Sequence, residues 1–377
     1  MGAAYDRTVT EESAEVVIVG GGAIGASTAF HLTELGVADV VLVERATLAS
    51  GSTGKSAGGI RAQFADELNV RIALRSIAEF ERFEELAGRP IDYEQSGYLF
   101  LLDREEDVAR FRKALTLQAS LGVPSRELSV EEALELVPQL SPDGLVAATF
   151  SPLDGRATAE AVVGGYAEAA ARRGVRIHQG EAVEAVELAG ERIAAVVTKR
   201  RRISTDTVVC AAGVWSPEVA ALAGVDLPVE GERRWIHFTP QDGGLQRPLP
   251  LTIDFTSGFY FHSEGPGLAF GGREQTLEEL AGPATRRLPV LAELPVASSW
   301  SGFYEVSPDH NAIVGEASSP GRFLYATGFS GHGFQQSPAV GEHLAELIAW
   351  REPTLDLSPF SLERFARGTP RAEAFVI

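Results

Sequence analysis

Three glycines near the N-terminus are spaced for phosphate binding. Gly20, Gly22 and Gly25 form the pattern G-x-G-x-x-G, directly after the apolar run "EVVIVG" and where apolar residues take up helical spacing. The first glycine of such a pattern permits a tight turn, the second lets a pyrophosphate approach the backbone, and the third allows close helix–strand packing. Free amides and a partial positive charge at the helix N-terminus then favour an anion. The spacing therefore predicts a phosphate-binding turn.

Glu44 extends this pattern to a dinucleotide. It ends a second apolar run, "DVVLVE", nineteen residues after Gly25. An acidic side chain at that place accepts hydrogen bonds from ribose hydroxyls and repels a 2′-phosphate. Strand, glycines, helix, strand and Glu in this order predict a dinucleotide site far more strongly than the glycines alone, which also fit an ordinary strand–helix turn. The pattern does not distinguish NAD from FAD.

A second glycine-rich entry to a helix lies near the C-terminal end. The segment "GFSGHGFQQSPAVGEHLAEL", residues 328–347, carries three glycines in its first six positions and then becomes apolar with helical spacing. Its helix start would present further free backbone amides. The alternative interpretation is a Schellman-type surface turn.

Composition excludes several classes of protein. The chain has 377 residues and a formal net charge of −19, which disfavours nucleic acid and anionic membranes as partners. Cys210 is its single cysteine, so neither an intramolecular disulfide nor a cysteine-based metal site is expected, and we expect no metal. No signal peptide and no membrane-spanning run are visible. A cytoplasmic protein is the default expectation.

The order of apolar runs predicts an α/β protein. Continuous β-branched runs near residues 15–20, 39–44 and 206–211 are typical of a parallel sheet covered on both faces. A long helix is expected over roughly 67–86. Between 227 and 300, short aromatic and proline-rich strands predict an antiparallel sheet. We therefore expect a discontinuous dinucleotide-binding domain, with a second domain inserted in two pieces: 1–90, 151–225 and 301–377 in the first, and 91–150 and 226–300 in the second.

The motifs taken together resemble a known family. "GGGAIGAS", "VER", "GSTGKSAGGIR", "CAAGVWSP", "SPDHNAIVG" and "GFSGHGFQQSPAVG" occur in the order found in the FAD-dependent D-amino-acid oxidase (DAO) superfamily. The chain is most similar to the glycine and sarcosine oxidase group, and within it to the β subunits of heteromeric sarcosine oxidase and L-proline dehydrogenase. The resemblance implies a Rossmann-like FAD-binding domain of the GR2 type with an inserted antiparallel-sheet substrate domain.

The resemblance also implies which residues bind FAD. One helix start would hold the pyrophosphate and the other the isoalloxazine, where amides near N1–C2=O stabilise the reduced ring. Val183 would touch adenine, although a plain core role fits it nearly as well. The implied cofactor-binding residues are Gly20, Gly22, Ala23, Ile24, Gly25, Glu44, Arg45, Ser52, Thr53, Lys55, Ser56, Ala57, Gly58, Gly59, Val183, Ala211, Ala212, Gly213, Trp215, Gly302, Tyr304, Gly328, Ser330, Gly331, His332, Gly333, Phe334 and Gln335.

The family reaction oxidises a C–N bond of an amino acid by hydride transfer to flavin N5, and the imine then hydrolyses. Arg61 matches an arginine that would bind the substrate carboxylate, and Arg273 is the second candidate; a structural salt bridge is the alternative for either. Tyr260 matches a tyrosine above the substrate. His332 would form a hydrogen bond near the flavin instead of acting as an acid or base, and Gln335 stands where relatives carry a substrate-binding lysine.

Departures from the family pattern bear on the flavin linkage and the electron acceptor. Gly302 and Gly54–Lys55 stand where relatives attach flavin through cysteine or histidine, so we expect non-covalent FAD. Ala269 stands where oxidases carry an oxygen-activating lysine, which favours a dehydrogenase or a slow oxidase. The expected partners are a small amino-acid or amine substrate and an acceptor, either oxygen or a partner subunit. The alternatives are a weakly active electron-transferring subunit and an NAD-dependent dehydrogenase.

Overall fold

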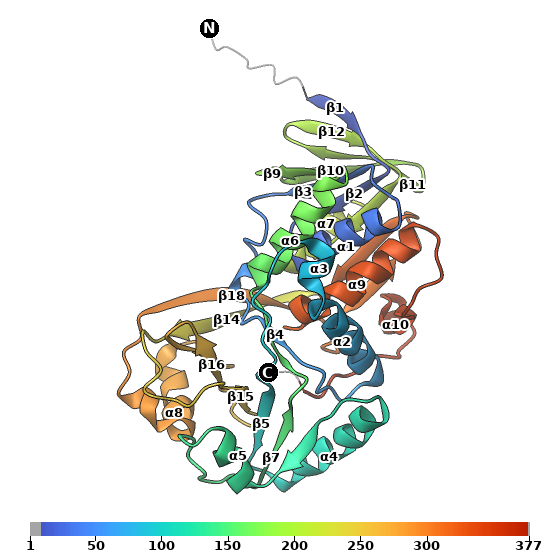
Figure 1. Cartoon of the computed structure of the whole chain (residues 1–377). Helices are drawn as coiled ribbons and strands as arrows, with labels where there is room; N and C mark the ends of the chain where they lie inside the picture. Colours follow the sequence, from blue (N-terminus) through green and yellow to red (C-terminus); the bar gives the residue numbers. More distant parts are fainter. Residues whose placement is uncertain (1–8, 376–377) are drawn as a thin grey trace.

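The computed structural model describes residues 9–375 and contains two large sheets, one above the other in Figure 1. The six-stranded sheet has the order β19-β20-β13-β2-β3-β9. Its strands are β2 (Val16–Val19), β3 (Val40–Glu44), β9 (Arg176–Gln179), β13 (Thr207–Cys210), β19 (Ile313–Glu316) and β20 (Phe323–Thr327).

The six-stranded sheet is parallel except for its edge strand β19. Alternate residues of β2 pack on opposite faces. Val16 and Ile18 contact α1 (Ala23–Glu34) and α9 (Gly333–Ile348), whereas Val17 and Val19 contact the second layer. That layer is the four-stranded sheet of β1 (Thr10–Ser13), β10 (Val183–Ala189), β11 (Arg192–Thr198) and β12 (Arg201–Ser204), with α7 (Ser216–Ala221) beside it. Burial on both faces explains the continuous apolar runs.

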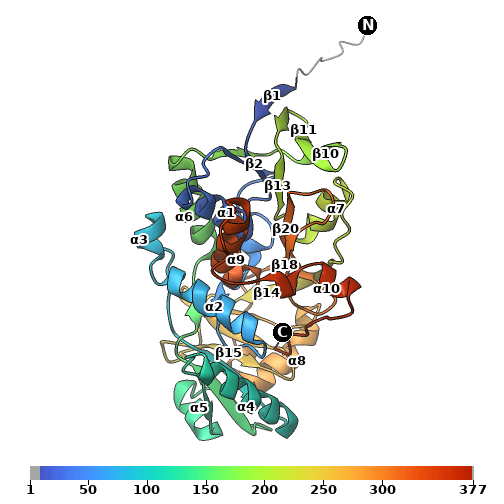
Figure 2. The same ribbon diagram turned by 90° about the vertical axis from the view of Figure 1, so that its right-hand side faces the viewer.

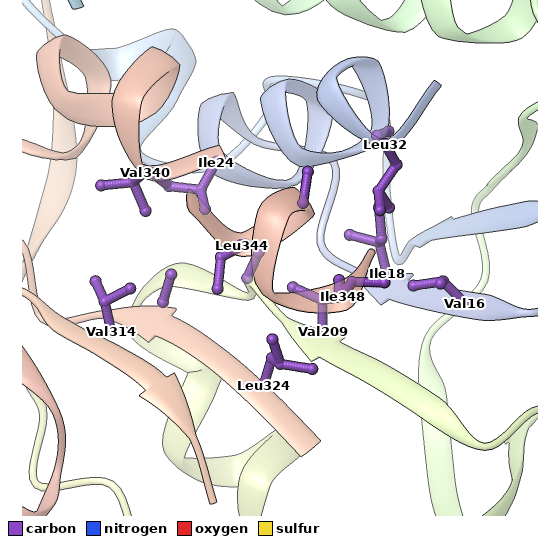
Figure 3. Close-up of a cluster of buried hydrophobic side chains, with 14 of the residues drawn as sticks. Val16, Ile18, Ile24, Leu32, Val209, Val314, Leu324, Val340, Leu344 and Ile348 are labelled. Atoms are coloured by element: carbon purple, nitrogen blue, oxygen red, sulfur yellow. The ribbon is translucent and has the colours of Figure 1, made fainter. Parts of the chain in front are cut away.

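The first and last long helices lie side by side on this sheet. Figure 2 shows α1 and α9 adjacent, and Figure 3 shows Ile24 and Val340 facing each other across their contact. Below them, Val209 and Leu324 extend from the strands into the same core. The helices α1 and α9 follow β2 and β20, which run parallel, so both glycine turns lie at the carboxyl end of the six-stranded sheet.

The eight-stranded sheet has the order β18-β14-β17-β16-β15-β5-β7-β6 and is antiparallel apart from the β15–β5 pair. One face packs on α5 (Val130–Leu136) and α8 (Leu277–Arg287), and part of the other on α4 (Glu105–Ser120). The strands are β5 (Tyr98–Leu102), β6 (Arg126–Leu128), β7 (Ala147–Ser151), β14 (Glu230–Phe238), β15 (Leu251–Asp254), β16 (Tyr260–Glu264), β17 (Gly267–Gly271) and β18 (Ser298–Val306).

The predicted α/β class with a Rossmann-like unit is confirmed, and one local expectation changes. The helix expected over 67–86 is divided into α2 (Glu67–Phe80) and α3 (Phe83–Ala87), which ends at Gly88 in a left-handed conformation. The domain division stays a prediction, and its boundary at residue 300 falls inside β18. The remaining elements are α6 (Ala159–Arg172), α10 (Glu363–Ala366), β4 (Gly59–Ile60), β8 (Gly155–Arg156) and the 3-10 turns Thr53–Lys55, Gly213–Trp215, Pro289–Ala292 and Ser358–Phe360.

No helix in the described part of the chain is long and apolar enough to span a bilayer.

Candidate functional site

A cavity of about 650 Å³ lies between the six-stranded and the eight-stranded sheets. Both glycine turns line it, since Gly22 from the first turn and Gly331 from the second contribute to the same wall. The turns are separated by some three hundred residues of sequence but meet because α1 and α9 lie side by side (Figure 2). One ligand can therefore contact both helix starts.

The first glycine turn is shaped by contacts that exclude side chains. Gly20 has a φ of +114°, and a Cβ there would collide with the carbonyl oxygen of Ala211 in the neighbouring β13 connection. A Cβ on Gly25 would collide with the carbonyl of Gly20, so this glycine lets α1 pack against the turn. The two positions have the roles that the spacing predicts, although Gly25 itself does not line the cavity.

The start of α1 presents backbone donors to the cavity. Ala23 donates its amide to Oγ1 of Thr53 at 3.1 Å, whereas the amides of Gly22 and Ile24 have no partner in the described residues. The first turn of the helix contains no acidic residue. Glu44 accepts hydrogen bonds from the amides of Gly21 at 2.8 Å and Ala46 at 2.7 Å, and still lines the cavity. An anion would be stabilised at this helix start.

Glu305 of β18, a partly buried residue, holds the second glycine turn on the side away from α9. Its carboxylate accepts a hydrogen bond from Thr327 Oγ1 at 2.9 Å and interacts with the amides of Gly328 and Phe329. Burial nevertheless raises the pKa of Glu305 to about 7, because the carboxylate is removed from water. The amides of Gly331, Gly333 and Phe334 have no partner in the described part and line the cavity.

Arg61 is buried in a network that uses both ends of its guanidinium fork. Nη1 donates to the carbonyl of Gln63, and Nη2 donates to the carbonyl of Phe375 at 2.6 Å. Nη2 also lies 3.0 Å from Nε2 of His332, and the group stacks 4.2 Å from the ring centre of Phe64. Desolvation lowers the pKa of Arg61. The fork that would bind a carboxylate bidentately is therefore already engaged.

His332 and Gln335 are oriented by the same arginine. Oε1 of Gln335 accepts the backbone amide of Arg61 at 2.7 Å, which turns its Nε2 away from that contact. His332 caps α9 and is 8% exposed. Burial, followed by the charge of Arg61, lowers the pKa of His332 well below its usual value, so the imidazole is neutral and its Nε2 accepts from Arg61.

One face of the eight-stranded sheet forms the opposite wall of the cavity. On β14, Arg234 and Ile236 alternate onto this face, and Arg234 stands opposite Gly302 of β18. A Cβ on Gly271 of β17 would lie 2.7 Å from the hydroxyl of Tyr260, so the missing side chain lets this phenol lie across the strand. The residues of the sheet that line the cavity are Tyr98, Arg234, Ile236, Leu251, Ile253, Tyr260, Gly302, Phe303, Tyr304 and Glu305.

The side chain of Lys55 occupies the space next to Gly302 where a side chain at position 302 would lie. A Cβ at Gly302 would lie 2.7 Å from Cβ of Lys55, so a side chain at position 302 is accommodated only if the lysine moves. The Lys55 ammonium lies 5.6 Å from the ring centre of Trp300. Non-covalent attachment of FAD stays a prediction.

Most sequence-predicted site residues lie on the cavity. Gly58, Gly328 and Arg273 do not, nor does Gly25; Arg273 is exposed, with its side chain packed against Gly258. The predicted residues that the cavity brings together are Gly20, Gly22, Ala23, Ile24, Glu44, Arg45, Ser52, Thr53, Lys55, Ser56, Ala57, Gly59, Arg61, Val183, Ala211, Ala212, Gly213, Trp215, Tyr260, Gly302, Tyr304, Ser330, Gly331, His332, Gly333, Phe334 and Gln335.

Sequence reasoning missed Arg234, Tyr98, Glu305 and the aliphatic pair Leu251 and Ile253, all of which line the cavity. The alternation of "ERRWIHF" places Arg234 and Ile236 on one face of a strand, which is a usable signal. Which face meets the cavity depends on pairing with residues some seventy positions away, and no local pattern indicates that.

The chain is similar over most of its length to known proteins. The model of the family "DAO: FAD dependent oxidoreductase" matches residues 15–347. FAD-dependent oxidoreductase domain-containing protein 1 of Bos taurus is 33% identical, over 99% of this chain and 89% of that protein. The crystal structure of L-proline dehydrogenase from P. horikoshii superposes with a TM-score of 0.89 at 32% identity, covering 96% of this chain and 100% of the other.

Mitochondrial sarcosine dehydrogenase of Mus musculus is 28% identical over 96% of this chain, but the match covers only 44% of that longer protein. Glycine oxidase from Geobacillus kaustophilus has a TM-score of 0.83 at 26% identity, covering 94% of this chain and 99% of the other. The names of these relatives point to different amino-acid donors.

Proposed function

The chain belongs to the DAO family of FAD-dependent oxidoreductases, and on that premise we propose that it oxidises the C–N bond of a small amino acid. The candidate donors are of the sarcosine, proline, dimethylglycine or glycine type. One observation carries the proposal: a single cavity joins two helix starts with free amides to a wall of arginine, tyrosine and aliphatic side chains. Relatives named for sarcosine, dimethylglycine and proline support this donor class.

The residues present fit FAD. The free amides of Gly22 and Ile24, with Thr53 beside them, suit a diphosphate, and Glu44 suits a ribose. A second set of free amides at Gly331 and Gly333 suits the electron-rich edge of a ring. When bound, FAD supplies the redox chemistry by accepting two electrons and a proton from the donor, whose imine product then reacts with water.

The protein's part in the reaction includes keeping the substrate amine unprotonated. Around Tyr260 and Tyr304 the charged side chains that act on the phenols are cationic, namely Arg234 on both and Arg61 on Tyr304. Positive charge and burial both disfavour an ammonium ion. The neutral His332 accepts from Arg61, so its lone pair is not available to the amine. The site therefore selects the neutral amine instead of removing a proton with a dedicated base.

We propose that the enzyme is a dehydrogenase or a slow oxidase, so that oxygen is a poor electron acceptor for it. Ala269 is buried within β17 and pairs with Phe238 and His262, outside the cavity, so its position offers no group to activate oxygen. Lys55 also lines the cavity, so any activation of oxygen by a lysine would come from this residue.

The test is anaerobic mixing of the FAD-loaded protein with sarcosine, L-proline, dimethylglycine and glycine, followed by admission of air. Bleaching of the flavin absorbance by at least one donor supports C–N oxidation, and slow return of the colour supports a dehydrogenase. No bleaching by any amino acid would refute the proposed function. Acid precipitation should release the yellow chromophore into the supernatant; colour retained in the pellet would contradict non-covalent binding.

A further inference from the structure

We propose that Arg234, on β14, is the receptor for the carboxylate of the substrate. The inference rests on the proposed oxidation of an amino acid and adds the residue that recognises its anionic end. It assigns Arg61, the arginine expected from the sequence, to positioning His332 and Gln335.

The guanidinium of Arg234 retains an unsatisfied donor. Its Nη2 pairs with Glu232 at 2.5 Å, and its Nη1 donates to the carbonyl of Arg233 at 3.3 Å. Nε is buried and has no hydrogen-bond partner in the described residues. A buried cationic N–H without an acceptor is costly, so the site is complete only when an acceptor arrives. Glu232 is half exposed and can return to water when a carboxylate takes its place.

The other arginines on the cavity are differently engaged. Both terminal nitrogens of Arg61 hold main-chain carbonyls, and the guanidinium of Arg45 stacks 3.5 Å from the ring centre of Trp215. Arg273 lies outside the cavity. Among the described residues, Arg234 is therefore the cavity-lining arginine that keeps a buried N–H without an acceptor.

Two neutral donors stand beside Arg234. Its guanidinium lies 5.4 Å from the ring centre of Tyr304, and its charge acts on Tyr260 as well. Burial raises the pKa of both tyrosines, so the phenols stay protonated and can donate. One arginine with two neutral hydroxyls provides charge and hydrogen bonds for one carboxylate without repelling it.

The rest of this wall limits the substrate's side chain. Ile236 follows Arg234 on the same face, and Leu251 and Ile253 of β15 continue the surface. All three are buried and aliphatic. A second charge on the substrate would lie against these aliphatic side chains without a partner, and burying an unpaired charge there is energetically unfavourable. The proposed substrate class is an α-amino acid with a small aliphatic chain or ring and a single carboxylate.

The test compares Arg234→Met and Arg234→Lys with Arg233→Met, the neighbouring arginine that does not line the cavity. Two readouts are measured for each FAD-loaded protein. The first is the perturbation of the flavin spectrum by propionate, a carboxylate that cannot be oxidised at a C–N bond. The second is kcat/KM for each amino acid that reduces the wild-type protein and for its decarboxylated amine, such as L-proline and pyrrolidine.

For Arg234→Met we expect at least about a hundredfold weaker propionate binding and an equal loss of kcat/KM for the amino acid, carried mainly by KM. The kcat/KM for the decarboxylated amine should change less than about threefold, which separates lost carboxylate recognition from misfolding. Arg234→Lys should keep part of the affinity, and Arg233→Met should match the wild type. Unchanged propionate affinity in Arg234→Met would overturn the inference.

The readouts separate this inference from the proposed function. An amino acid that reduces wild-type and Arg234→Met equally well would remove Arg234 from recognition and leave C–N oxidation standing. Loss of propionate binding in Arg234→Met, in a protein that no amino acid reduces, would support the anion site and refute the proposed reaction.

Discussion

The two glycine-rich helix starts do different work although both open onto one cavity. At α1 the glycines make room for backbone, since Gly20 and Gly25 admit carbonyl oxygens that any side chain would displace. At α9 the glycines make room for side chains, since a Cβ on Gly331 would lie 2.6 Å from the ring of Tyr304. The first turn packs mainly against main-chain atoms, including the carbonyl of Ala211, whereas the side chains of Glu305 and Tyr304 pack against the second.

This difference has a functional consequence. A diphosphate needs amides and little else, and α1 supplies them within six residues of sequence. A redox ring and its substrate need charged and hydrogen-bonding side chains around them. The start of α9 lines the same cavity as Arg61, Tyr260 and Tyr304. Substitutions at the first turn should therefore abolish cofactor retention, and substitutions at the second should alter turnover.

The largest effect is expected for Gly20→Ala. A methyl group would collide with the carbonyl of Ala211 while the residue holds a φ of +114°, so the turn must rearrange at a cost of several kcal/mol. We expect at least about a hundredfold weaker FAD binding, measured by the ratio of flavin to protein absorbance after purification. Gly36→Ala is the matched control, because Gly36 has a φ of +86° but open space around it and should cost only about 1–2 kcal/mol. Full FAD retention in Gly20→Ala would refute the pyrophosphate assignment.

Gly331→Ala should give a smaller and different effect. The added methyl group would push the ring of Tyr304 and strain a residue with a φ of +94°. Because the proposed diphosphate contacts lie at α1, we expect the flavin to stay bound while the rate of its reduction falls about tenfold. Gly333→Ala is the milder comparison, because its Cβ would have Phe329 as its nearest neighbour at 3.3 Å. Stopped-flow reduction distinguishes the two. If Gly331→Ala lost FAD as completely as Gly20→Ala, the two turns would not differ as argued.

His332→Gln tests whether the second turn carries a base. Because burial and Arg61 keep the pKa of His332 well below its usual value, the imidazole is already neutral at physiological pH and does not titrate there. We expect kcat/KM to fall about tenfold through the disturbed Arg61 contact, with an unchanged shape of the profile between pH 6 and 10. Disappearance of a limb of that profile in the variant would show that His332 acts as an acid or base.

The smallest effect concerns Glu305 and stability. Its folded-state pKa, raised from 4.5 to about 7 by burial, means that the native protein holds a proton which the unfolded chain releases between these pH values. The free energy of unfolding should therefore fall as pH rises through this window, by at most about 1.4 kcal/mol per pH unit. Glu305→Gln should flatten that slope in urea titrations at pH 5, 6 and 7. An equally steep slope in the variant would assign the proton to another group.

The sequence predicted the parts of the molecule that local rules determine. The glycine fingerprint and the strands before and after it form a sequence pattern within about thirty residues, and the family motifs correctly indicated FAD. The break between α2 and α3 was missed because neither Glu81 nor Arg82 is a helix-breaking residue.

The cofactor-binding part of the candidate site could be predicted from the sequence, but most of the substrate-facing part could not. Cofactor residues lie in contiguous loops that carry motifs, whereas the substrate wall is assembled by strand pairing. Arg234 meets Gly302 across β14 and β18, and Tyr260 crosses Gly271 to reach the same face. Arg61 was correctly placed on the cavity, but the carbonyls of Gln63 and Phe375 that occupy its fork come from the fold and not from any pattern in the sequence.

A crystal structure of the FAD-loaded protein would test most directly whether one extended dinucleotide bridges the two helix starts. We predict density for the diphosphate within hydrogen-bonding distance of the Gly22 and Ile24 amides, and for the tricyclic ring against Gly331 and Gly333, with Arg234 on the open side of that ring. A ring located away from Gly331, or a diphosphate away from Gly22, would contradict the account.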